Sequence, residues 1–141
     1  MSIQVATGGC LCGQVRFRLA GELIWAGYCH CSSCRRFTGS VVTNWVGVRD
    51  TDVVFTSGQP AQFTQAGVDR GFCRDCGSSL TYRADRFPDY LQVHIGALDD
   101  CEAVQPMAHV HYAEKPGWFE VADQLPRYPA SAAADGNDWQ S

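Results

Sequence analysis

Hydrophobic and polar residues alternate over short stretches of this chain, and the clearest case is QVRFRL at Gln14–Leu19. Val15, Phe17 and Leu19 would point to one side of a strand, and the polar residues between them to the other. Stretches rich in β-branched and aromatic residues predict further strands at 40–48, 52–56, 61–65, 70–72, 80–83, 91–96 and 110–112. Turns containing Gly or Pro separate them. The pattern predicts a mainly β protein of short antiparallel strands, closed or folded over on itself.

Helical patterns are short and few. Only Ser32–Phe37 and Ala97–Ala103 have one, and neither exceeds about two turns. The chain has 141 residues, of which 45% are hydrophobic and 18% charged, which suits one domain with a single core. We expect that domain to span residues 1–129. The final stretch, Ala130–Ser141, is small and polar and is expected to form a loose tail.

Charge and hydropathy limit the partners and the cellular location that we expect for the protein. The net charge of −4 gives no broad basic surface, so we expect no nucleic-acid partner. No apolar run approaches the roughly 18 residues that a membrane span needs, and MSIQVATGG lacks the pattern of a signal peptide. We therefore expect a cytoplasmic protein without membrane contact. In that compartment its eight cysteines would stay reduced and serve as metal ligands or catalytic thiols.

Two pairs of cysteines share one local pattern. Cys10 and Cys12 form CxC, Cys73 and Cys76 form CxxC, and a glycine follows each pair, as in a zinc knuckle. Glycine at that point can adopt a positive φ and turn backbone N–H groups toward the thiolates. A disulfide within either pair would close only a tiny loop and contribute little to folding. We predict that the four cysteines form one closed, structural zinc site.

A third cysteine group, CxCxxC, offers only three ligands: Cys29, Cys31 and Cys34. One interpretation is a second closed structural site, completed by Cys101 or by a histidine. The other is a zinc site whose fourth position stays open to substrate or water, which is how catalytic zinc is usually held. Spacing alone does not separate the two.

Two arginines, Arg35 and Arg36, follow this group directly. Three thiolates on Zn²⁺ leave a net negative charge, which these side chains could balance. They could also hold an anionic substrate. The alternative is a pair of surface arginines beside a negatively charged centre.

Three sequence segments, GGCLCGQVRF, CHCSSCRRFTGS and FCRDCGSSL, occur in this order and are specific as a set. Together they resemble the glutathione-dependent formaldehyde-activating enzyme family, also called the centromere protein V family. The late segment with Lys115, Pro116 and Trp118, followed by DQLP at 123–126, is similar to the end of that family's domain. The resemblance runs from about Gly8 to Tyr128, which is nearly the whole predicted domain.

The resemblance implies a β-tent fold of antiparallel sheets around two zinc ions per chain. It places a structural zinc on Cys10, Cys12, Cys73 and Cys76, and a second zinc on Cys29, Cys31 and Cys34. In the family the second metal is associated with the thiol substrate glutathione. The fourth ligand would then come from that substrate or from water.

The implied activity is that of a carbon–sulfur lyase similar to S-(hydroxymethyl)glutathione synthase. A thiol held by zinc is deprotonated and can add to the carbonyl carbon of formaldehyde, and the reverse step cleaves the carbon–sulfur bond. A zinc-stabilised thiol carrier or protein-binding module without turnover is the alternative hypothesis. A redox or zinc-buffer role for the CxCxxC group is a third.

The four histidines have milder expected roles. His30 lies between two ligand positions, so we expect its side chain to face away and bond to backbone. His94 in LQVHIG falls on the polar face of a strand. His109 and His111 share one face of HVHY and are expected to be solvated or hydrogen-bonded rather than metal-bound.

For six other residues we expect only ordinary structural roles. Cys101 has no cysteine at ligand spacing and is expected to be a small buried or partly exposed residue. Trp45 and Trp118 are expected to pack in the core or in the wall of a pocket. Thr38, Gly39 and Ser40 are expected to form a turn into the next strand.

Overall fold

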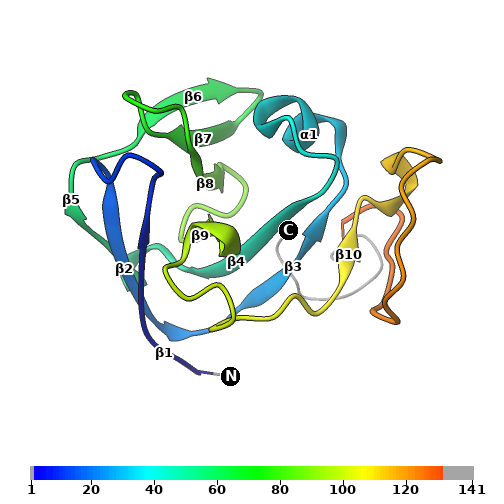
Figure 1. Cartoon of the computed structure of the whole chain (residues 1–141), viewed down its shortest axis with the longest axis horizontal. Helices are drawn as coiled ribbons and strands as arrows, with labels where there is room; N and C mark the ends of the chain where they lie inside the picture. The colour runs from blue at the N-terminus through cyan, green and yellow to red at the C-terminus, as the bar shows by residue number, and fades with distance from the viewer. Residues whose placement is uncertain (1, 132–141) are drawn as a thin grey trace.

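The computed structural model describes residues 2–131 as two β-sheets and one α-helix (Figure 1). One sheet has three strands in the order β1 (Ser2–Gly9), β2 (Arg16–Glu22) and β5 (Val53–Ser57). The other has seven strands, in the order β10 (His109–Val110), β3 (Trp25–Cys29), β4 (Thr43–Arg49), β9 (Tyr90–His94), β8 (Ser79–Ala84), β7 (Val68–Phe72) and β6 (Ala61–Gln65). The mainly β prediction is therefore confirmed.

Short helical segments connect the strands. The α-helix α1 covers Ser32–Thr38 and confirms the first predicted helix. Three single-turn 3₁₀ helices complete the description: η1 (Asp50–Asp52), η2 (Ile95–Ala97) and η3 (Tyr112–Glu114). The second predicted helix, Ala97–Ala103, is wrong, because η2 ends at Ala97 and the chain then turns to meet β1. Leu98 there forms a β-bridge with Gly8, and the Asp99 N–H donates to the Thr7 carbonyl at 2.8 Å.

Each predicted strand is present, 61–65 with its predicted bounds and the others with shifted ends, but β1 and β3 were not predicted. Within β3, Trp25, Ala26, Gly27 and Cys29 are all buried, so the strand shows no alternation of hydrophobic and polar residues. One pairing also departs from the antiparallel prediction. β10 runs parallel to β3, with His109 opposite Tyr28 and Val110 opposite Cys29.

The hydrophobic core lies between the two sheets. Phe17 and Leu19 from β2 pack in one cluster with Val46, Val48 and Val93 from β4 and β9. These positions alternate along their strands with residues that point the other way. The far face of the seven-stranded sheet is therefore available to build a site.

A row of cross-strand neighbours crosses that far face. Trp25 pairs with Gly47, Gly47 with Gln92, Gln92 with Tyr82, and Tyr82 with Arg70. Directly paired residues place their side chains on the same face, with Cβ atoms about 5 Å apart. Five strands thus contribute to one polar and aromatic surface.

The chain after β10 folds back beside it, as the orange segment of Figure 1 shows. The His109 N–H donates to the Pro126 carbonyl, and the Tyr128 N–H donates to the His109 carbonyl, both at 2.8 Å. None of the helices in the described part of the chain is long and apolar enough to cross a membrane. Apart from its first two residues, the predicted tail 130–141 lies outside the described residues.

Candidate metal centres and the cavity beside them

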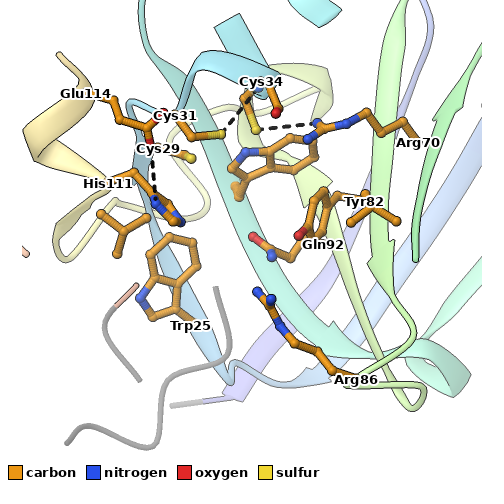
Figure 2. Close-up of a pocket in the computed structure, with 14 residues that line it drawn as sticks. Trp25, Cys29, Cys31, Cys34, Arg70, Tyr82, Arg86, Gln92, His111 and Glu114 are labelled. Carbon is orange, nitrogen blue, oxygen red and sulfur yellow. Dashed lines mark hydrogen bonds and ion pairs between the residues drawn. The ribbon is translucent and has the colours of Figure 1, made fainter. Parts of the chain in front are cut away.

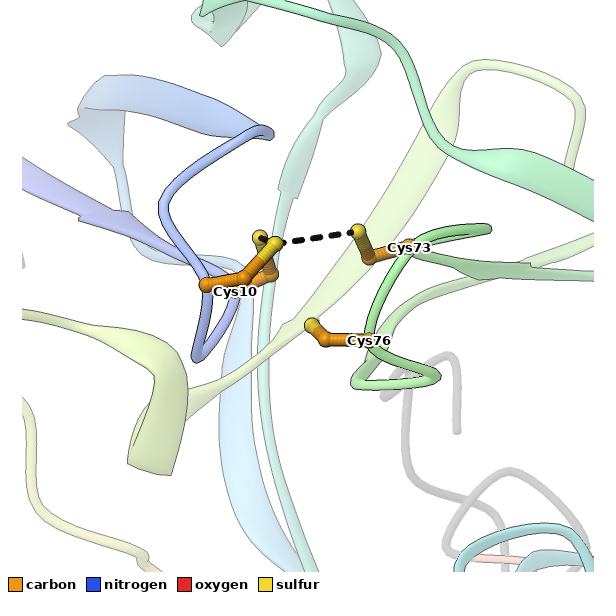
Figure 3. Close-up of side chains that lie close together, drawn as sticks. Cys10, Cys73 and Cys76 are labelled. Atoms are coloured by element: carbon orange, nitrogen blue, oxygen red, sulfur yellow. Dashed lines mark hydrogen bonds between the residues drawn. The ribbon is translucent and has the colours of Figure 1, made fainter.

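Four cysteines from two distant segments meet in one cluster: Cys10, Cys12, Cys73 and Cys76. Their sulfur atoms all lie within 4.8 Å of one another. Figure 3 shows Cys10 facing Cys73 and Cys76 across the gap between the two loops. The Sγ atoms of Cys10 and Cys12 are 3.6 Å apart, and those of Cys12 and Cys73 are 3.8 Å apart. A tetrahedral ion with metal–sulfur bonds of about 2.3 Å requires sulfur–sulfur distances of about 3.8 Å, so the cluster could hold such an ion.

The glycines after each pair adopt the conformation that a knuckle requires. Gly13 and Gly77 have φ values of 83° and 80°, where a side chain would be strained. The turns bring donors to the sulfur atoms, and the Val15 N–H donates to Cys10 Sγ at 3.2 Å. Hydrogen bonds from the Ser78 hydroxyl and N–H lower the pKa of the Cys76 thiol to about 6. The turn therefore favours the thiolate of Cys76 even before a cation is considered.

The second cluster is formed by Cys29, Cys31 and Cys34, whose sulfur atoms also lie within 4.8 Å of one another. Cys29 ends β3, and Cys31 caps α1 by accepting a hydrogen bond from the Cys34 N–H at 3.3 Å. The helix thus fixes two of the three ligands through its own first turn. The helix ends at Thr38, and the following Gly39, with a φ of 76°, forms the predicted turn toward β4.

Arg70 from β7 lies beside this cluster and donates a hydrogen bond to Cys34 Sγ at 3.4 Å. Its guanidinium stacks between the rings of Phe37 and Tyr82, at 5.6 and 5.2 Å from their centroids. Hydrogen bonds from the Cys29 and Cys31 thiols, together with the Arg70 guanidinium, lower the pKa of the Cys34 thiol to about 2. Arg70 therefore supplies the balancing charge that the sequence suggested for Arg35 and Arg36.

Within residues 2–131, no fourth cysteine, histidine or carboxylate joins the three thiols within ligand distance of one another. Cys101 is exposed and is not part of either cluster. His30 is fully buried, but its Nε2 atom lies 2.8 Å from Nδ1 of His109. The three-ligand geometry is the one expected for an open metal site.

A cavity of about 260 Å³ adjoins the three thiols. Its wall includes the row that crosses the seven-stranded sheet, with Trp25, Gln92, Tyr82 and Arg70. Figure 2 shows the cysteines and Arg70 at one end, Tyr82 and Gln92 in the middle, and Arg86 at the other end. A molecule bound through the open position would therefore extend along Tyr82 and Gln92 toward Arg86.

The chain belongs to the glutathione-dependent formaldehyde-activating enzyme family. The family's model, described as "Glutathione-dependent formaldehyde-activating enzyme", matches residues 5–114. A Halomonas elongata protein provisionally named as this enzyme is 31% identical to the chain over 125 residues. The match covers 81% of this chain and 79% of that relative. A crystal structure of a Rhodobacter sphaeroides protein is 26% identical, with a TM-score of 0.57, and covers 71% of this chain and 91% of that one.

The cysteines of the three sequence motifs form the two clusters, as expected for a member of this family. Arg35 and Arg36, in contrast, do not line the cavity. The Arg35 guanidinium donates to the Glu114 carbonyl at 3.5 Å, and Arg36 is exposed. The arginines in the cavity wall are Arg70 and Arg86, which belong to no cysteine motif. Anion contacts by Arg35 and Arg36 stay a prediction.

Among the histidines, His30 differs most from expectation. His30 bonds to a second buried histidine rather than to backbone, and His109 Nε2 in turn lies 2.9 Å from an Asp123 carboxylate oxygen. Burial and the neighbouring His109 lower the pKa of His30 to about 4. His111 is separated from this chain of bonds and pairs with Glu114 at 3.5 Å. His94 lies on the face of β9 opposite Val93 and Ile95, as expected, but this face is not polar at that point, because His94 is buried and stacks on the buried Trp45 at 3.8 Å.

Trp118 and Cys101 contradict their default interpretations because both are exposed, Trp118 to 73%. Trp45 is buried and lines the cavity as expected. The residues that sequence reasoning missed are Arg70, Tyr82, Arg86 and Gln92. Gln92, a polar residue between Leu91 and Val93, was the signal that could have pointed to the cavity.

Proposed function

We propose that this chain is a zinc-dependent carbon–sulfur lyase that handles the adduct of a small thiol with formaldehyde. The observation that carries the proposal is a three-cysteine cluster that no further ligand joins among residues 2–131, beside a cavity of about 260 Å³. The names of the family and of its Halomonas relative support glutathione as the thiol and formaldehyde as the carbonyl compound. We assign the closed four-cysteine cluster a structural zinc and the open cluster the catalytic one.

Zinc at the open cluster would lower the pKa of an incoming thiol and hold its sulfur as a thiolate. The chain's own contribution begins with Arg70, which donates to Cys34 Sγ and offsets the negative charge of the three cysteines. Trp45 and Tyr82, whose ring centroids are 5.9 Å apart, both line the cavity and would limit the access of water to the reacting sulfur.

Tyr82 is our candidate for the proton transfer that the reaction requires. During synthesis a bond forms between sulfur and the carbonyl carbon, and the carbonyl oxygen takes up a proton; cleavage reverses both changes. Tyr82 projects into the cavity (Figure 2), and burial raises the pKa of its phenol. The phenol carries its proton at neutral pH, and although the raised pKa makes it a weaker acid, its position in the cavity would allow it to donate that proton to the oxygen.

The test compares Cys31→Ala and Tyr82→Phe with the wild-type protein in an assay of S-hydroxymethyl adduct formation and breakdown by NMR. Cys31→Ala should retain its fold, bind one zinc less and lose the activity. Tyr82→Phe should bind both metals and turn over about 10²-fold more slowly, the usual contribution of a general acid. Zinc content and circular dichroism serve as controls.

Adduct turnover that is equal in wild-type and Cys31→Ala protein would contradict the lyase. Thiol binding without any turnover by the wild-type protein would favour the thiol-carrier alternative.

A further inference from the structure

A network of hydrogen bonds joins the segment after β10 to the loop that carries the three cysteines. His109 lies 2.9 Å from an Asp123 carboxylate oxygen through its Nε2 atom, and 2.8 Å from Nε2 of His30 through its Nδ1 atom. His30 stands between Cys29 and Cys31 in the sequence. Both histidines are buried, whereas the Asp123 side chain is 37% exposed. The network therefore runs from near the surface to the residue between two cysteines of the open cluster.

The carboxylate sets the direction of both hydrogen bonds. A carboxylate can only accept, so His109 donates to Asp123 from Nε2. In a neutral imidazole the second nitrogen is an acceptor, so Nδ1 of His109 accepts from the Nε2–H group of His30. Asp123 is itself held, because the Leu125 N–H donates to its other oxygen at 3.0 Å. The orientation of the His30 ring thus depends on Asp123, although the two residues lie far apart in the sequence.

His30 is not the residue that stability alone would favour at this buried position. Its Nδ1 atom has no hydrogen-bond partner in the part of the chain that the structure describes, and its neighbours are the rings of His109, Tyr112 and Phe119. A buried acceptor without a partner costs free energy that an apolar side chain in the same space would not. The advantage of a histidine here lies in the hydrogen bond that its other nitrogen makes to His109.

The two cysteines on either side of His30 belong to different elements. Cys29 ends β3, where the Thr43 hydroxyl donates to its carbonyl at 3.3 Å, and Cys31 caps α1. His30 is the single residue that joins them, and its N–H donates to the Val110 carbonyl at 3.1 Å. Its backbone and its ring are therefore both held, and together they set how Cys29 and Cys31 approach each other. A metal site tolerates deviations of only about 0.2 Å in its metal–ligand distances, so this arrangement matters for binding.

We propose that Asp123 and His109 position the open metal site through His30. The inference rests on the proposed function, because it takes the three-cysteine cluster to be the site of a metal. The three residues are positioning residues, which touch neither metal nor substrate and hold the stretch 29–31 in its binding geometry before the metal arrives. Less ordering is then needed when the metal binds. The segment after β10, remote from the cysteine motifs in the sequence, thereby becomes part of the open site.

The experiment is removal of zinc from the loaded protein by increasing concentrations of a chelator, followed by the absorbance of the zinc–chelator complex. Two release steps are expected, and Cys31→Ala identifies the step of the open site because that variant lacks it. His30→Leu and Asp123→Leu should weaken zinc binding at this step by about tenfold to a hundredfold, as for other residues that orient metal ligands. The step of the four-cysteine site should stay within about twofold of the wild-type protein.

Further variants separate positioning from a general loss of stability. If Asp123 acts through His30, adding Asp123→Leu to His30→Leu should weaken the open site no further than His30→Leu alone. Asp123→Asn keeps an oxygen acceptor for His109 and should retain most of the zinc affinity. Glu120→Leu is the matched control, because Glu120 is an exposed acidic residue of the same segment, and it should change neither step.

Unchanged zinc release in His30→Leu and Asp123→Leu would overturn the inference. Equal weakening of both zinc sites would also overturn it, because it would indicate general destabilisation. Failure of the proposed function gives a different result: the wild-type protein would hold zinc at the open site without turning over the adduct, and the variants would still decide the positioning role. A wild-type protein that releases only one zinc would overturn both.

Discussion

His94 links the site face of the sheet to the acid stability of the protein. Its Nε2 atom lies 2.8 Å from the Ser79 hydroxyl, and its Nδ1 atom lies 3.0 Å from the Asn44 carbonyl. Burial lowers the pKa of His94 to about 4 from its usual value near 6.5. The unfolded chain therefore binds the proton more readily than the folded one between about pH 6.5 and pH 4. Stability should fall as the pH is lowered through this window.

We predict that His94→Gln removes this component of the pH dependence. Between pH 7.5 and pH 5 the wild-type protein should lose about 2 kcal/mol of unfolding free energy more than the variant. Urea denaturation of the zinc-saturated proteins at both pH values measures the difference. His30, whose pKa is also lowered to about 4, is present in both proteins, so its contribution cancels. Identical pH slopes would show that His94 is not protonated differently on unfolding.

The strands determine which residues meet at the site, and the sequence revealed this only in part. The three cysteine groups could be predicted because metal ligands at short spacing leave a local pattern, and α1 could be predicted from the same stretch. The convergence of Arg70, Tyr82 and Gln92 depends on the register of β7, β8 and β9. Register is set by pairing between distant segments, so no local pattern encodes it. β3 was not predicted because burial on both faces removes the alternation of hydrophobic and polar residues.

Gly47 tests how tightly these strands are packed. A Cβ atom at this position would overlap the Tyr90 ring, which lies over the β4 backbone. We predict that Gly47→Ala lowers the unfolding free energy by about 1–3 kcal/mol because β4 or the ring must shift. Gly117→Ala is the matched control, because nothing lies within 4 Å of its added carbon. Urea denaturation with equal midpoints for the two variants would show that the Tyr90 ring moves aside at no cost.

Across the whole molecule, the four-cysteine cluster joins the first hairpin to the loop between β7 and β8. It closes a long stretch of chain, and Cys73 in it is fully buried. The three-cysteine cluster instead joins only β3 to the helix that follows. Loss of metal from the two clusters should therefore have unequal consequences for the fold.

We predict that Cys73→Ala lowers the thermal midpoint by more than about 10 °C, because a structural metal contributes several kcal/mol to folding. Cys31→Ala should shift it by only a few degrees and retain one zinc per chain. Differential scanning fluorimetry with parallel metal analysis gives both readings. Equal midpoints for the two variants would mean that both metals stabilise the fold to the same extent.

The two clusters also differ in when they can form as the chain emerges from the ribosome. The stretch 29–34 contains all three of its cysteines, so it can capture a cation early in synthesis. The four-cysteine cluster, in contrast, can be completed only after Cys76 has been synthesised. Since chains are synthesised from the N-terminus at about 5–20 residues per second, this interval lasts several seconds. Scarcity of metal during translation would therefore affect the four-cysteine cluster at a later stage of synthesis than the three-cysteine cluster.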